Sequence, residues 1–530
     1  MKDNLVYLKP NVVIEPLFDK WYAWAHLISP ATAAMNLQKR HLKIMESYID
    51  APELHEEAAR NPAMLGGPFM DYSENRVAEI SGLRDFILSE RKDLLDFAGA
   101  VQHLFAILKD HPCGYSLESL YKKVPDILKG YVELTVDLNN NPSFRFYEQV
   151  LYKSKYYKEE CQSIALYLID KDERPFVLST PRIEGEGVLH LPLAFKDKRI
   201  DQLFKMQRIP ERYEAIREQF ELTPEEDILF RSLFTEEPTV PYRKYTGSGV
   251  RTRYFGHACI LTETREVSIL TDPVISYGYD ADVKRFTYTD LPDQIDIVFI
   301  THNHQDHILF ETMLQLRHKA RYIVVPRNGS RQLQDPSLSL MFREIGFENV
   351  IELDEFETIT INNCRITGVP FIGEHCDLDI RTKLCYHVET GANTFLFAAD
   401  CCNVEPKLFE HAYAFLGDID IIFLGMECDG APLSWLYGPL LPEPLSRDRD
   451  FSRRLTGSNY ERAIDLVNRF HPKEVYIYAM GMEPWLKYIM SLNHTAESYP
   501  IIESNRLIQE CLSRNINSER LFGEKEIVYK

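Results

Sequence analysis

The sequence lacks the features that would place it in a membrane or on a nucleic acid. No apolar run in its 530 residues approaches the roughly 20 residues that cross a bilayer, and the most apolar stretch, 419–426, is as short as a strand. The first 20 residues carry charges throughout, so we expect no export signal. Lys and Arg number 60 against 80 Asp and Glu, a net charge of −20. We therefore expect a cytoplasmic protein with no nucleic-acid partner and no membrane partner.

Cysteine pairs that would indicate disulfides or a zinc motif are also missing. The ten cysteines lie far apart except for the adjacent pair Cys401-Cys402, and none forms a CxxC motif. We expect reduced thiols that behave as small buried apolar side chains. Hydrophobic residues make up 45% of the chain, while Pro and Gly number only 29 and 24. This composition predicts a globular protein, and the length favours two or three domains.

The first part of the chain mixes helical and strand patterns without a catalytic signature. Apolar residues recur at helical spacing over 78–108. Strand-like runs include 131–138, 144–151 and 176–179. The segment 235–248 is rich in Pro and Gly and has little apolar periodicity, which is typical of a linker. We predict an α+β N-terminal domain over 1–240.

From residue 246 to residue 530 the pattern changes to strands in two series with helices between them. This pattern predicts two sheets sandwiched by helices, an α/β architecture. The strand-like runs are 251–255, 260–264, 267–271, 295–300, 321–325, 350–353, 358–361, 364–369, 384–388, 394–398, 419–424 and 475–478.

The most specific motif joins the run 296–300 to a helical pattern over 309–318. It reads His302-Asn303-His304-Gln305-Asp306-His307. A buried strand, a short loop and a helix start can hold two metal ions. We expect His302 and His304 to bind one ion, and Asp306 and His307 to bind its neighbour.

This HxHxDH pattern resembles the signature of the metallo-β-lactamase superfamily. The segments 254–258 and 270–273 are similar to the opening strands of that superfamily, and Asp400, after Ala398-Ala399, is similar to its bridging aspartate. The resemblance covers about residues 246–530. It implies an αββα sandwich with a dinuclear metal site at one sheet edge.

Two departures from the hydrolytic members concern the ligands. Those members have a His between the motif and the bridging Asp, whereas the corresponding segment here, 371–377, offers Glu374. They also place a His near the C-terminal strand, and 478–485 contains none. Both changes shift the ligands from imidazole towards carboxylate, which favours a harder, redox-active ion over zinc. Three His and the carboxylates of Asp306, Glu374 and Asp400 would leave two divalent cations with a net charge of about +1.

With Glu374 in this place, and about 240 residues ahead of the motif domain, the whole chain resembles the di-iron β-hydroxylases of the chloramphenicol-biosynthesis (CmlA) type. The resemblance implies an O2-dependent di-iron monooxygenase of antibiotic biosynthesis. Its substrate would be an amino acid held as a thioester on a nonribosomal peptide synthetase carrier domain, hydroxylated at the β-carbon. It further implies that His302, His304 and Glu374 bind one iron, that Asp306 and His307 bind the other, and that Asp400 bridges them.

The same resemblance implies the cofactors and partners. Two iron ions, cycling between Fe2+ and Fe3+, would use O2 as co-substrate. Because the sequence has no flavin or iron–sulfur motif, electrons would come from an external donor, a reductase. The partners would be the aminoacyl-loaded carrier domain and this reductase, and the N-terminal region would supply docking, homodimer contacts or both.

Several residues near the motif keep two interpretations. His375 could replace Glu374 as the ligand, and His494 is the late candidate for a further ligand. His257 is interpreted as a structural histidine. For Asp272, a hydrogen bond to a ligand His is one of two equally favoured interpretations; the other is that it makes no such bond. Glu427, at the end of a buried strand, is either a catalytic carboxylate or proton donor beside the ions, or a solvent-exposed strand end.

The connection 428–459 is long, and its apolar residues favour a cover over the substrate channel. Its basic end, 446–454, would meet a phosphate or an acidic carrier domain, or else pair with its own acids. The rival function is a dizinc hydrolase of a lactone, thioester or phosphodiester, using a metal-bound hydroxide. A second rival is a scaffold with a decayed site, which would bind no metal.

Overall fold

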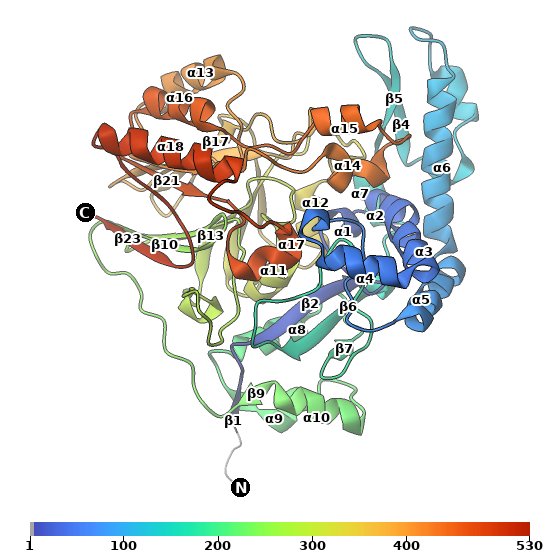
Figure 1. Cartoon of the computed structure of the whole chain (residues 1–530), viewed down its shortest axis with the longest axis horizontal. Coiled ribbons are helices and arrows are strands. Elements are labelled where there is room, and N and C mark those ends of the chain that lie inside the picture. The colour runs from blue at the N-terminus through green and yellow to red at the C-terminus, as the bar shows by residue number, and fades with distance from the viewer. Residues whose placement is uncertain (1–4) are drawn as a thin grey trace.

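The computed structural model describes residues 5–530, which form a two-sheet sandwich with a large N-terminal region against it (Figure 1). The first sheet has seven strands. In spatial order they are β15 (Val350–Leu353), β14 (Ala320–Pro326), β13 (Ile295–Phe299), β12 (Ser268–Thr271), β11 (Cys259–Glu263), β10 (Val250–Gly256) and β23 (Lys525–Tyr529). Strands β12 to β15 run parallel, and the remaining pairs are antiparallel.

The second sheet also has seven strands and faces the first. In spatial order they are β16 (Thr358–Ile361), β17 (Cys364–Pro370), β18 (Leu384–Glu389), β19 (Thr394–Phe397), β20 (Ile421–Gly425), β21 (Glu474–Tyr478) and β22 (Asn517–Arg520). The core between the sheets is apolar and aromatic, with the rings of Phe299 and Tyr386 stacked at 4.5 Å. Continuous apolar runs such as 295–300 produce this core because both faces of their strands are buried.

Helices cover the two outer faces. The second sheet is covered by α13 (Pro406–Leu416), α16 (Tyr460–Phe470) and α18 (Tyr499–Ser513), and the first by α11 (Phe310–Leu316) and α12 (Leu338–Glu344). Shorter helices lie in the connections: α14 (Leu433–Tyr437), α15 (Arg447–Ser452) and α17 (Lys487–Met490). The predicted αββα sandwich is therefore confirmed.

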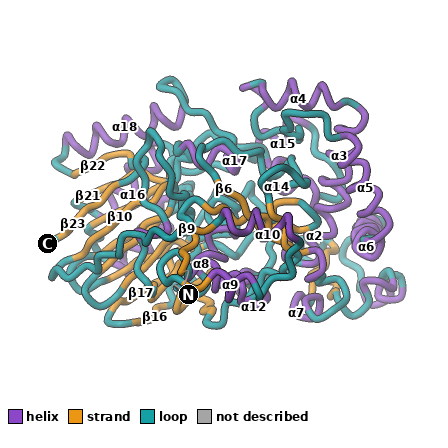
Figure 2. Tube along the Cα trace, turned by 90° about the horizontal axis from the view of Figure 1, so that it is seen from below, coloured by secondary structure: helices purple, strands orange, loops and turns teal. Residues whose placement is uncertain are grey.

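The N-terminal region has its own sheets and most of the helices on the other side of the molecule (Figure 2). Its antiparallel sheet has the order β3 (Trp21–Tyr22), β2 (Val12–Phe18), β6 (Gln162–Leu168) and β7 (Leu189–Leu191). The hairpin β4 (Val132–Val136) and β5 (Pro142–Phe146) and the small sheet β8 (Glu211–Arg212), β1 (Leu5–Leu8) and β9 (Phe234–Thr235) complete the strands. Its helices are α1 (Ala25–Ile28), α2 (Pro30–Asn36), α3 (Leu42–Asp50), α4 (Pro52–Arg60), α5 (Val77–Glu90), α6 (Lys92–Lys109), α7 (Glu148–Tyr152), α8 (Lys198–Lys205), α9 (Tyr213–Arg217) and α10 (Pro224–Ser232).

The two regions share one apolar core and one buried ion-pair cluster. The core runs without a break from β2 and α6 to α11 and the outer face of the first sheet. The Arg174 guanidinium lies 2.5 Å from Glu15 and 2.7 Å from Glu311 of α11, and Arg182 lies 2.9 Å from Glu15. These contacts hold the N-terminal region against the sandwich.

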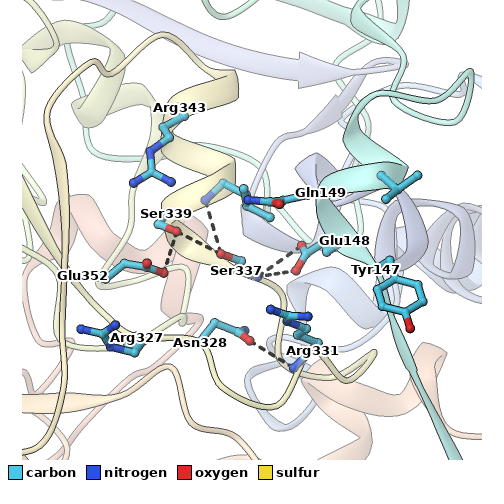
Figure 3. Close-up of a pocket in the computed structure, with 12 residues that line it drawn as sticks. Tyr147, Glu148, Gln149, Arg327, Asn328, Arg331, Ser337, Ser339, Arg343 and Glu352 are labelled. Atoms are coloured by element: carbon cyan, nitrogen blue, oxygen red, sulfur yellow. Dashed lines mark hydrogen bonds between the residues drawn. The ribbon is translucent and has the colours of Figure 1, made fainter. Parts of the chain in front are cut away.

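A second junction surrounds a depression of about 350 Å³ between α7 and the α12 segment (Figure 3). The backbone N–H of Ser337 donates to both carboxylate oxygens of Glu148, at 3.0 and 3.2 Å. Three arginines, Arg327, Arg331 and Arg343, also line the depression. None of the predicted metal ligands lines this depression, so it belongs to the domain junction.

The structure corrects two strand predictions in the N-terminal region. Residues 176–179 form a turn, because their polar groups bond to distant segments: the N–H of Val177 donates to the carbonyl of Tyr488 at 2.9 Å. The strand predicted over 144–151 ends at Phe146, and α7 follows. Within residues 5–530, no helix has the length and apolar character to span a bilayer.

Candidate metal centre

Four loops from the two sheets meet at one edge of the sandwich. Asp272 follows β12, and the segment 301–307 follows β13. From the facing sheet, Glu374 follows β17 and Asp400 follows β19. The ends of neighbouring strands lie at the same edge of a sheet, so residues that are far apart in the sequence come together there.

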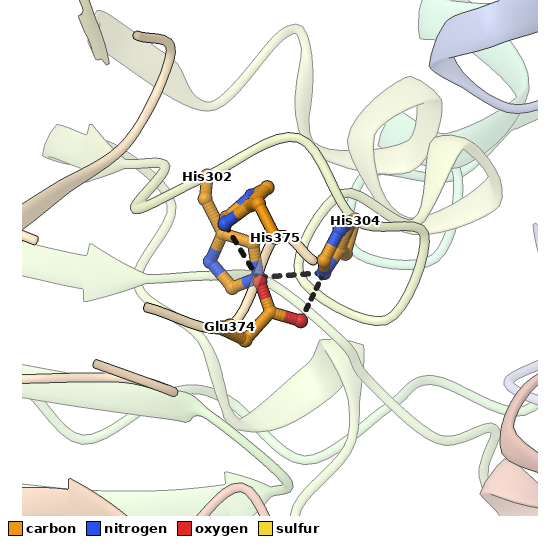
Figure 4. Close-up of side chains that lie close together, drawn as sticks. All are labelled: His302, His304, Glu374 and His375. Carbon is orange, nitrogen blue, oxygen red and sulfur yellow. Dashed lines mark hydrogen bonds and ion pairs between the residues drawn. The ribbon is translucent and has the colours of Figure 1, made fainter. Parts of the chain in front are cut away.

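The first group of possible ligands comprises His302, His304, Glu374 and His375, all buried (Figure 4). Their ligand-type atoms lie within 4.8 Å of one another. Nδ1 of His304 is 2.9 Å from one oxygen of Glu374 and 3.2 Å from Nε2 of His302. Nδ1 of His375 is 2.8 Å from the other oxygen of Glu374. The structure therefore brings Glu374 and its rival His375 into the same group.

The second group adjoins the first through His302 and Asp400. Nε2 of His307 is 3.1 Å from Oδ2 of Asp400 and 3.6 Å from Oδ2 of Asp306. Nε2 of His302 is 3.9 Å from the same oxygen of Asp400. Asp400 thus lies between the imidazoles of His302 and His307, the position that a bridging ligand requires.

His257 is closer to this group than the sequence suggested. Its Nδ1 accepts a hydrogen bond from the N–H of Gly481 at 3.3 Å, which places the ring proton on Nε2. Nε2 then donates to Oδ2 of Asp306 at 3.0 Å. The ring is satisfied, as expected of a structural histidine, and it also orients Asp306. Its position directly after Gly256 in the opening strands was the only signal in the sequence.

Outer hydrogen bonds fix two of the histidines. The carboxylate of Asp272 accepts three hydrogen bonds: one from Nδ1 of His307 at 2.8 Å, one from the backbone N–H of Thr301 at 2.8 Å and one from the Thr301 hydroxyl at 2.6 Å. This decides the open question about Asp272 in favour of a hydrogen bond to a histidine of the motif. Nε2 of His304 is 2.9 Å from the hydroxyl of Tyr437 in α14. Such partners set the tautomer and the ring orientation of a metal-binding histidine.

Several buried polar atoms of the two groups have no hydrogen-bond partner within residues 5–530. One oxygen of Asp400 and Nε2 of His375 are buried without a hydrogen-bond partner among the described residues, and one oxygen of Glu374 and Nδ1 of His375 face each other at 2.8 Å without the geometry of a hydrogen bond. Buried polar atoms are nearly always paired, so this concentration indicates a missing positive partner. With His257, which groups with Asp306 and His307, five imidazoles and three carboxylates cluster here, and this donor set fits a pair of metal ions.

The charges of these groups depend on one another. Burial raises the pKa of Glu374, but the nearby rings of His304 and His375 outweigh it and hold that pKa well below its usual value. Burial lowers the pKa of His307, but Asp400, Asp306 and Asp272 raise it well above the usual value. The pKa of His304 is also raised, against its burial, by Glu374, whereas burial lowers the pKa of His302 and of His375. Without a metal, His304 and His307 are therefore the imidazoles that hold protons beside the carboxylates. Because metal ligation requires neutral imidazole, binding of ions must release these protons.

The backbone of the site adopts conformations that cost energy. His257, Asp272, Glu374 and Ala399 all have positive φ, at 50°, 35°, 66° and 46°. Non-glycine residues rarely occupy this region, and such residues cluster at functional sites where the surrounding structure enforces them. The four residues belong to four different loops, so the strain is concentrated where these loops meet.

A cavity of about 530 Å³ opens above the two groups. His304, Asp306, Glu374 and Asp400 are among the residues that line it. The connection 428–459 forms one side, through residues such as Trp435 and Phe451, and Glu427 also lines the cavity. Nε2 of His494 lies 2.8 Å from the Glu427 carboxylate, and His494 belongs to none of the ligand groups among residues 5–530.

The fold and these two adjoining ligand groups define a dinuclear metalloprotein of the metallo-β-lactamase class. Comparisons with known proteins agree. Residues 7–238 match the model of the di-iron non-haem β-hydroxylase N-terminal domain, and residues 268–444 match the β-lactamase superfamily domain. The chain is 36% identical over 523 residues to the 4-amino-L-phenylalanyl-[CmlP-peptidyl-carrier-protein] 3-hydroxylase of Streptomyces venezuelae, covering 97% of this chain and 98% of that protein.

The crystal structure of CmlA, a di-iron β-hydroxylase from Streptomyces venezuelae, superposes with a TM-score of 0.93 at 35% identity, with all of both chains covered. The chain therefore belongs to the di-iron non-haem β-hydroxylase family. It is an enzyme whose cofactor is a pair of iron ions, and the di-iron interpretation prevails over the dizinc hydrolase.

Proposed function

We propose that the protein β-hydroxylates an amino acid held as a thioester on the carrier domain of a nonribosomal peptide synthetase. The observation that carries this proposal is the full-length similarity to a hydroxylase named for a peptidyl-carrier-protein substrate, combined with Glu374 in the ligand group. A cavity that reaches the ligand groups supplies room for a tethered aminoacyl group.

For the metal centre, we assign His302, His304 and Glu374 to one iron and Asp306 and His307 to the other, with Asp400 between them. When bound, the di-iron pair supplies the O2 activation that converts a C–H bond to C–OH, with electrons from an external donor. His375 remains the alternative to Glu374, since both lie in the first group. The carboxylate-rich set suits iron better than an all-imidazole set would.

The other residues of the site position groups and exclude water. Asp272, Tyr437 and His257 hold His307, His304 and Asp306. Glu427, paired with His494 beside the cavity, is placed to give up or accept a proton. The connection 428–459 covers the cavity and keeps bulk water from the reacting carbon.

We further propose two functional domains, with 1–240 serving carrier docking or homodimer contacts and 246–530 carrying the metal centre. Of the predicted linker, 235–248, Thr235 ends β9 and residues 236–248 contain no helix or strand. The external donor would be a separate reductase. The ten cysteines are all free, which fits a cytoplasmic setting.

The decisive experiment combines metal analysis with product mass. The iron-loaded enzyme, a chemical reductant and O2 are incubated with a loaded carrier domain, and we expect the aminoacyl group to gain one oxygen atom. The zinc-loaded enzyme should give no gain. Hydrolysis of the thioester by the zinc form, with no oxygen gain by the iron form, would overturn the proposal and revive the hydrolase.

The variant Glu374→His tests the ligand assignment. It should shift the metal content of the purified protein from iron towards zinc and abolish hydroxylation. The matched control is His375→Gln, which should retain iron if Glu374 is the ligand. Retention of iron-dependent activity by Glu374→His would instead favour His375.

A further inference from the structure

The cavity above the ligand groups has a wall that comes from the N-terminal region. Six residues between positions 63 and 69, directly after α4, line the same cavity as Glu374 and Asp400. We call this segment the 63–69 wall. Its residues at the cavity are Ala63, Met64, Leu65, Gly66, Gly67 and Phe69.

Both regions of the molecule fix the position of the wall. The indole N–H of Trp435 donates to the carbonyl of Gly66 at 2.9 Å, and the hydroxyl of Ser179 donates to the carbonyl of Phe69 at 2.7 Å. Gly66 has a φ of +74°, and a Cβ there would lie 3.3 Å from that of Ser491. A side chain at Gly66 would therefore crowd Ser491, and the positive φ of this residue also favours glycine.

Beyond the predicted metal ligands, the lining is mainly apolar, and its polar members are Gln305, Glu427, Ser491 and one ion pair. Trp435, Leu436 and Leu455 line the cavity from the connection 428–459, and Met490, the last residue of α17, and Leu492 also line it. The charged residues Asp429 and Arg454, which also line it, are paired with each other at 2.9 Å. This pair therefore leaves no free positive charge that could bind an acidic substrate side chain.

Large apolar side chains of the wall are left uncovered by the protein. Met64 is 46% exposed and Leu65 is 44% exposed. An apolar ligand that covers them gains free energy in proportion to the area removed from water, whereas a charged ligand would lose its hydration without a partner. Met is also an adaptable side chain, suited to bind a ring or a branched chain.

We propose that the 63–69 wall selects the side chain of the aminoacyl group, and that this side chain is bulky and apolar, aromatic or large aliphatic. The proposal rests on the proposed function. If the reacting β-carbon lies over the ligand groups and the thioester leaves towards the carrier, the rest of the side chain has to occupy the space between the ligand groups and the wall. The N-terminal region is then part of the substrate site.

The test measures binding of aminoacyl-pantetheine amides, in which an amide replaces the thioester, by calorimetry on the iron-loaded enzyme without reductant. We expect the phenylalanyl amide to bind at least about tenfold more tightly than the alanyl amide, and the aspartyl amide to bind most weakly. Equal affinities for the phenylalanyl and aspartyl amides would overturn the proposal.

Wall variants then locate the selectivity. Leu65→Ala and Met64→Ala should each reduce the preference for phenylalanyl over alanyl by about fivefold to tenfold. The matched control is Leu88→Ala on α5, where the leucine is 47% exposed and outside the cavity; it should keep the wild-type preference. Wall variants that behave like Leu88→Ala would refute the assignment. Because Leu65 and Met64 are exposed, their truncation leaves the fold intact.

Hydroxylation assays on carriers loaded with the same amino acids separate the two proposals. If no loaded carrier gains oxygen, the proposed function fails, while the binding series still decides whether the wall selects side chains. If carriers gain oxygen with one preference in the wild type and in both wall variants, the proposed function stands and the wall proposal fails.

Discussion

Two buried polar clusters in this molecule each contain carboxylates that face basic side chains. They differ in how completely the groups within each cluster are paired. In the interdomain cluster, Glu15 and Glu311 face Arg174 and Arg182, so the charges balance and each carboxylate has a guanidinium within 3 Å. In the metal centre, Asp400 retains a buried oxygen without a hydrogen-bond partner among the described residues, and one oxygen of Glu374 faces Nδ1 of His375 at 2.8 Å without the geometry of a hydrogen bond.

The difference separates a structural cluster from a binding site. Burying charges is costly unless every charge is paired, so a cluster that the chain completes by itself needs no further component. A cluster that the chain leaves incomplete, on strained backbone, must be completed by something bound. Breaking each cluster should therefore affect different properties: metal content for one and stability of the fold for the other.

The largest effect is expected from Asp400→Ala. The substitution removes the carboxylate between His302 and His307, and two ions held close together would repel each other without it. We expect less than the full complement of two irons and hydroxylation reduced by more than about 100-fold, the upper end for loss of an outer partner. Iron content and single-turnover product measure this.

Asp418→Ala is the control for that variant. Asp418 is an exposed aspartate of the same domain, paired with His471 at 2.9 Å and remote from the ligand groups. Its iron content should equal that of the wild type. Full iron content in Asp400→Ala would contradict the bridging role.

Breaking the interdomain cluster should destabilise the fold and spare the affinity for metal. Burial raises the pKa of Glu15, but Arg182 and Arg174 outweigh it and lower the pKa to about 2. A carboxylate whose pKa is lower in the folded than in the unfolded chain stabilises the fold fully at pH above its usual pKa, near 4.5. This stabilisation is lost as the pH falls towards 2. Glu15→Gln should thus cost about 3 kcal/mol at pH 7, measured by urea unfolding.

The pH dependence sharpens this test. The difference in unfolding free energy between wild type and Glu15→Gln should shrink as pH falls from about 4.5 to about 2, because the carboxylate of the unfolded chain takes up a proton there while the folded one stays charged. The control is Glu133→Gln, which breaks a half-exposed pair with Arg145 and should cost less than about 1 kcal/mol. A pH-independent difference would show that Glu15 is not stabilised by its arginines.

Asp272→Asn tests how far the metal centre depends on its outer partners. Asn keeps the shape of Asp272 but removes the charge that faces Nδ1 of His307. We expect iron affinity to fall about 10–100-fold with the fold intact. Asp296→Asn, at the other end of β13, where the carboxylate accepts from Ser268, should leave iron affinity unchanged. Equal iron affinities in the two variants would exclude Asp272 as an orienting group.

The sandwich was predictable because its strands are buried on both faces. All twelve strand-like runs from 251–255 to 475–478 coincide with strands of the two sheets, whereas the edge strands β22 and β23, which are only partly buried, were missed. In the N-terminal region, 176–179 has the composition of a strand but bonds to Tyr488 instead, a tertiary contact that local sequence does not encode.

The site was predictable where its residues are adjacent in the chain. The motif 302–307 is recognisable from the spacing of its residues, and Asp400 and Glu374 are recognisable from their places after predicted strands. Tyr437 and the 63–69 wall reach the site from distant segments, so only the fold reveals them. His257 and His375 were named, but their roles depend on which neighbours the loops bring within 3 Å.

The smallest effect is expected from Tyr437→Phe, which removes a single neutral hydrogen bond to Nε2 of His304. Burial, with the charge of Glu374 next, raises the pKa of Tyr437 well above its usual value, so the hydroxyl stays neutral. A hydrogen bond of this kind is worth about 1 kcal/mol, so iron affinity should fall about fivefold, measured by competition with a chelator. Tyr213→Phe removes a comparable hydrogen bond to Asp227 in the N-terminal region and should not change iron affinity. If Tyr437→Phe also leaves the affinity unchanged, His304 is oriented by Glu374 and the loop backbone alone, and α14 serves only to cover the cavity.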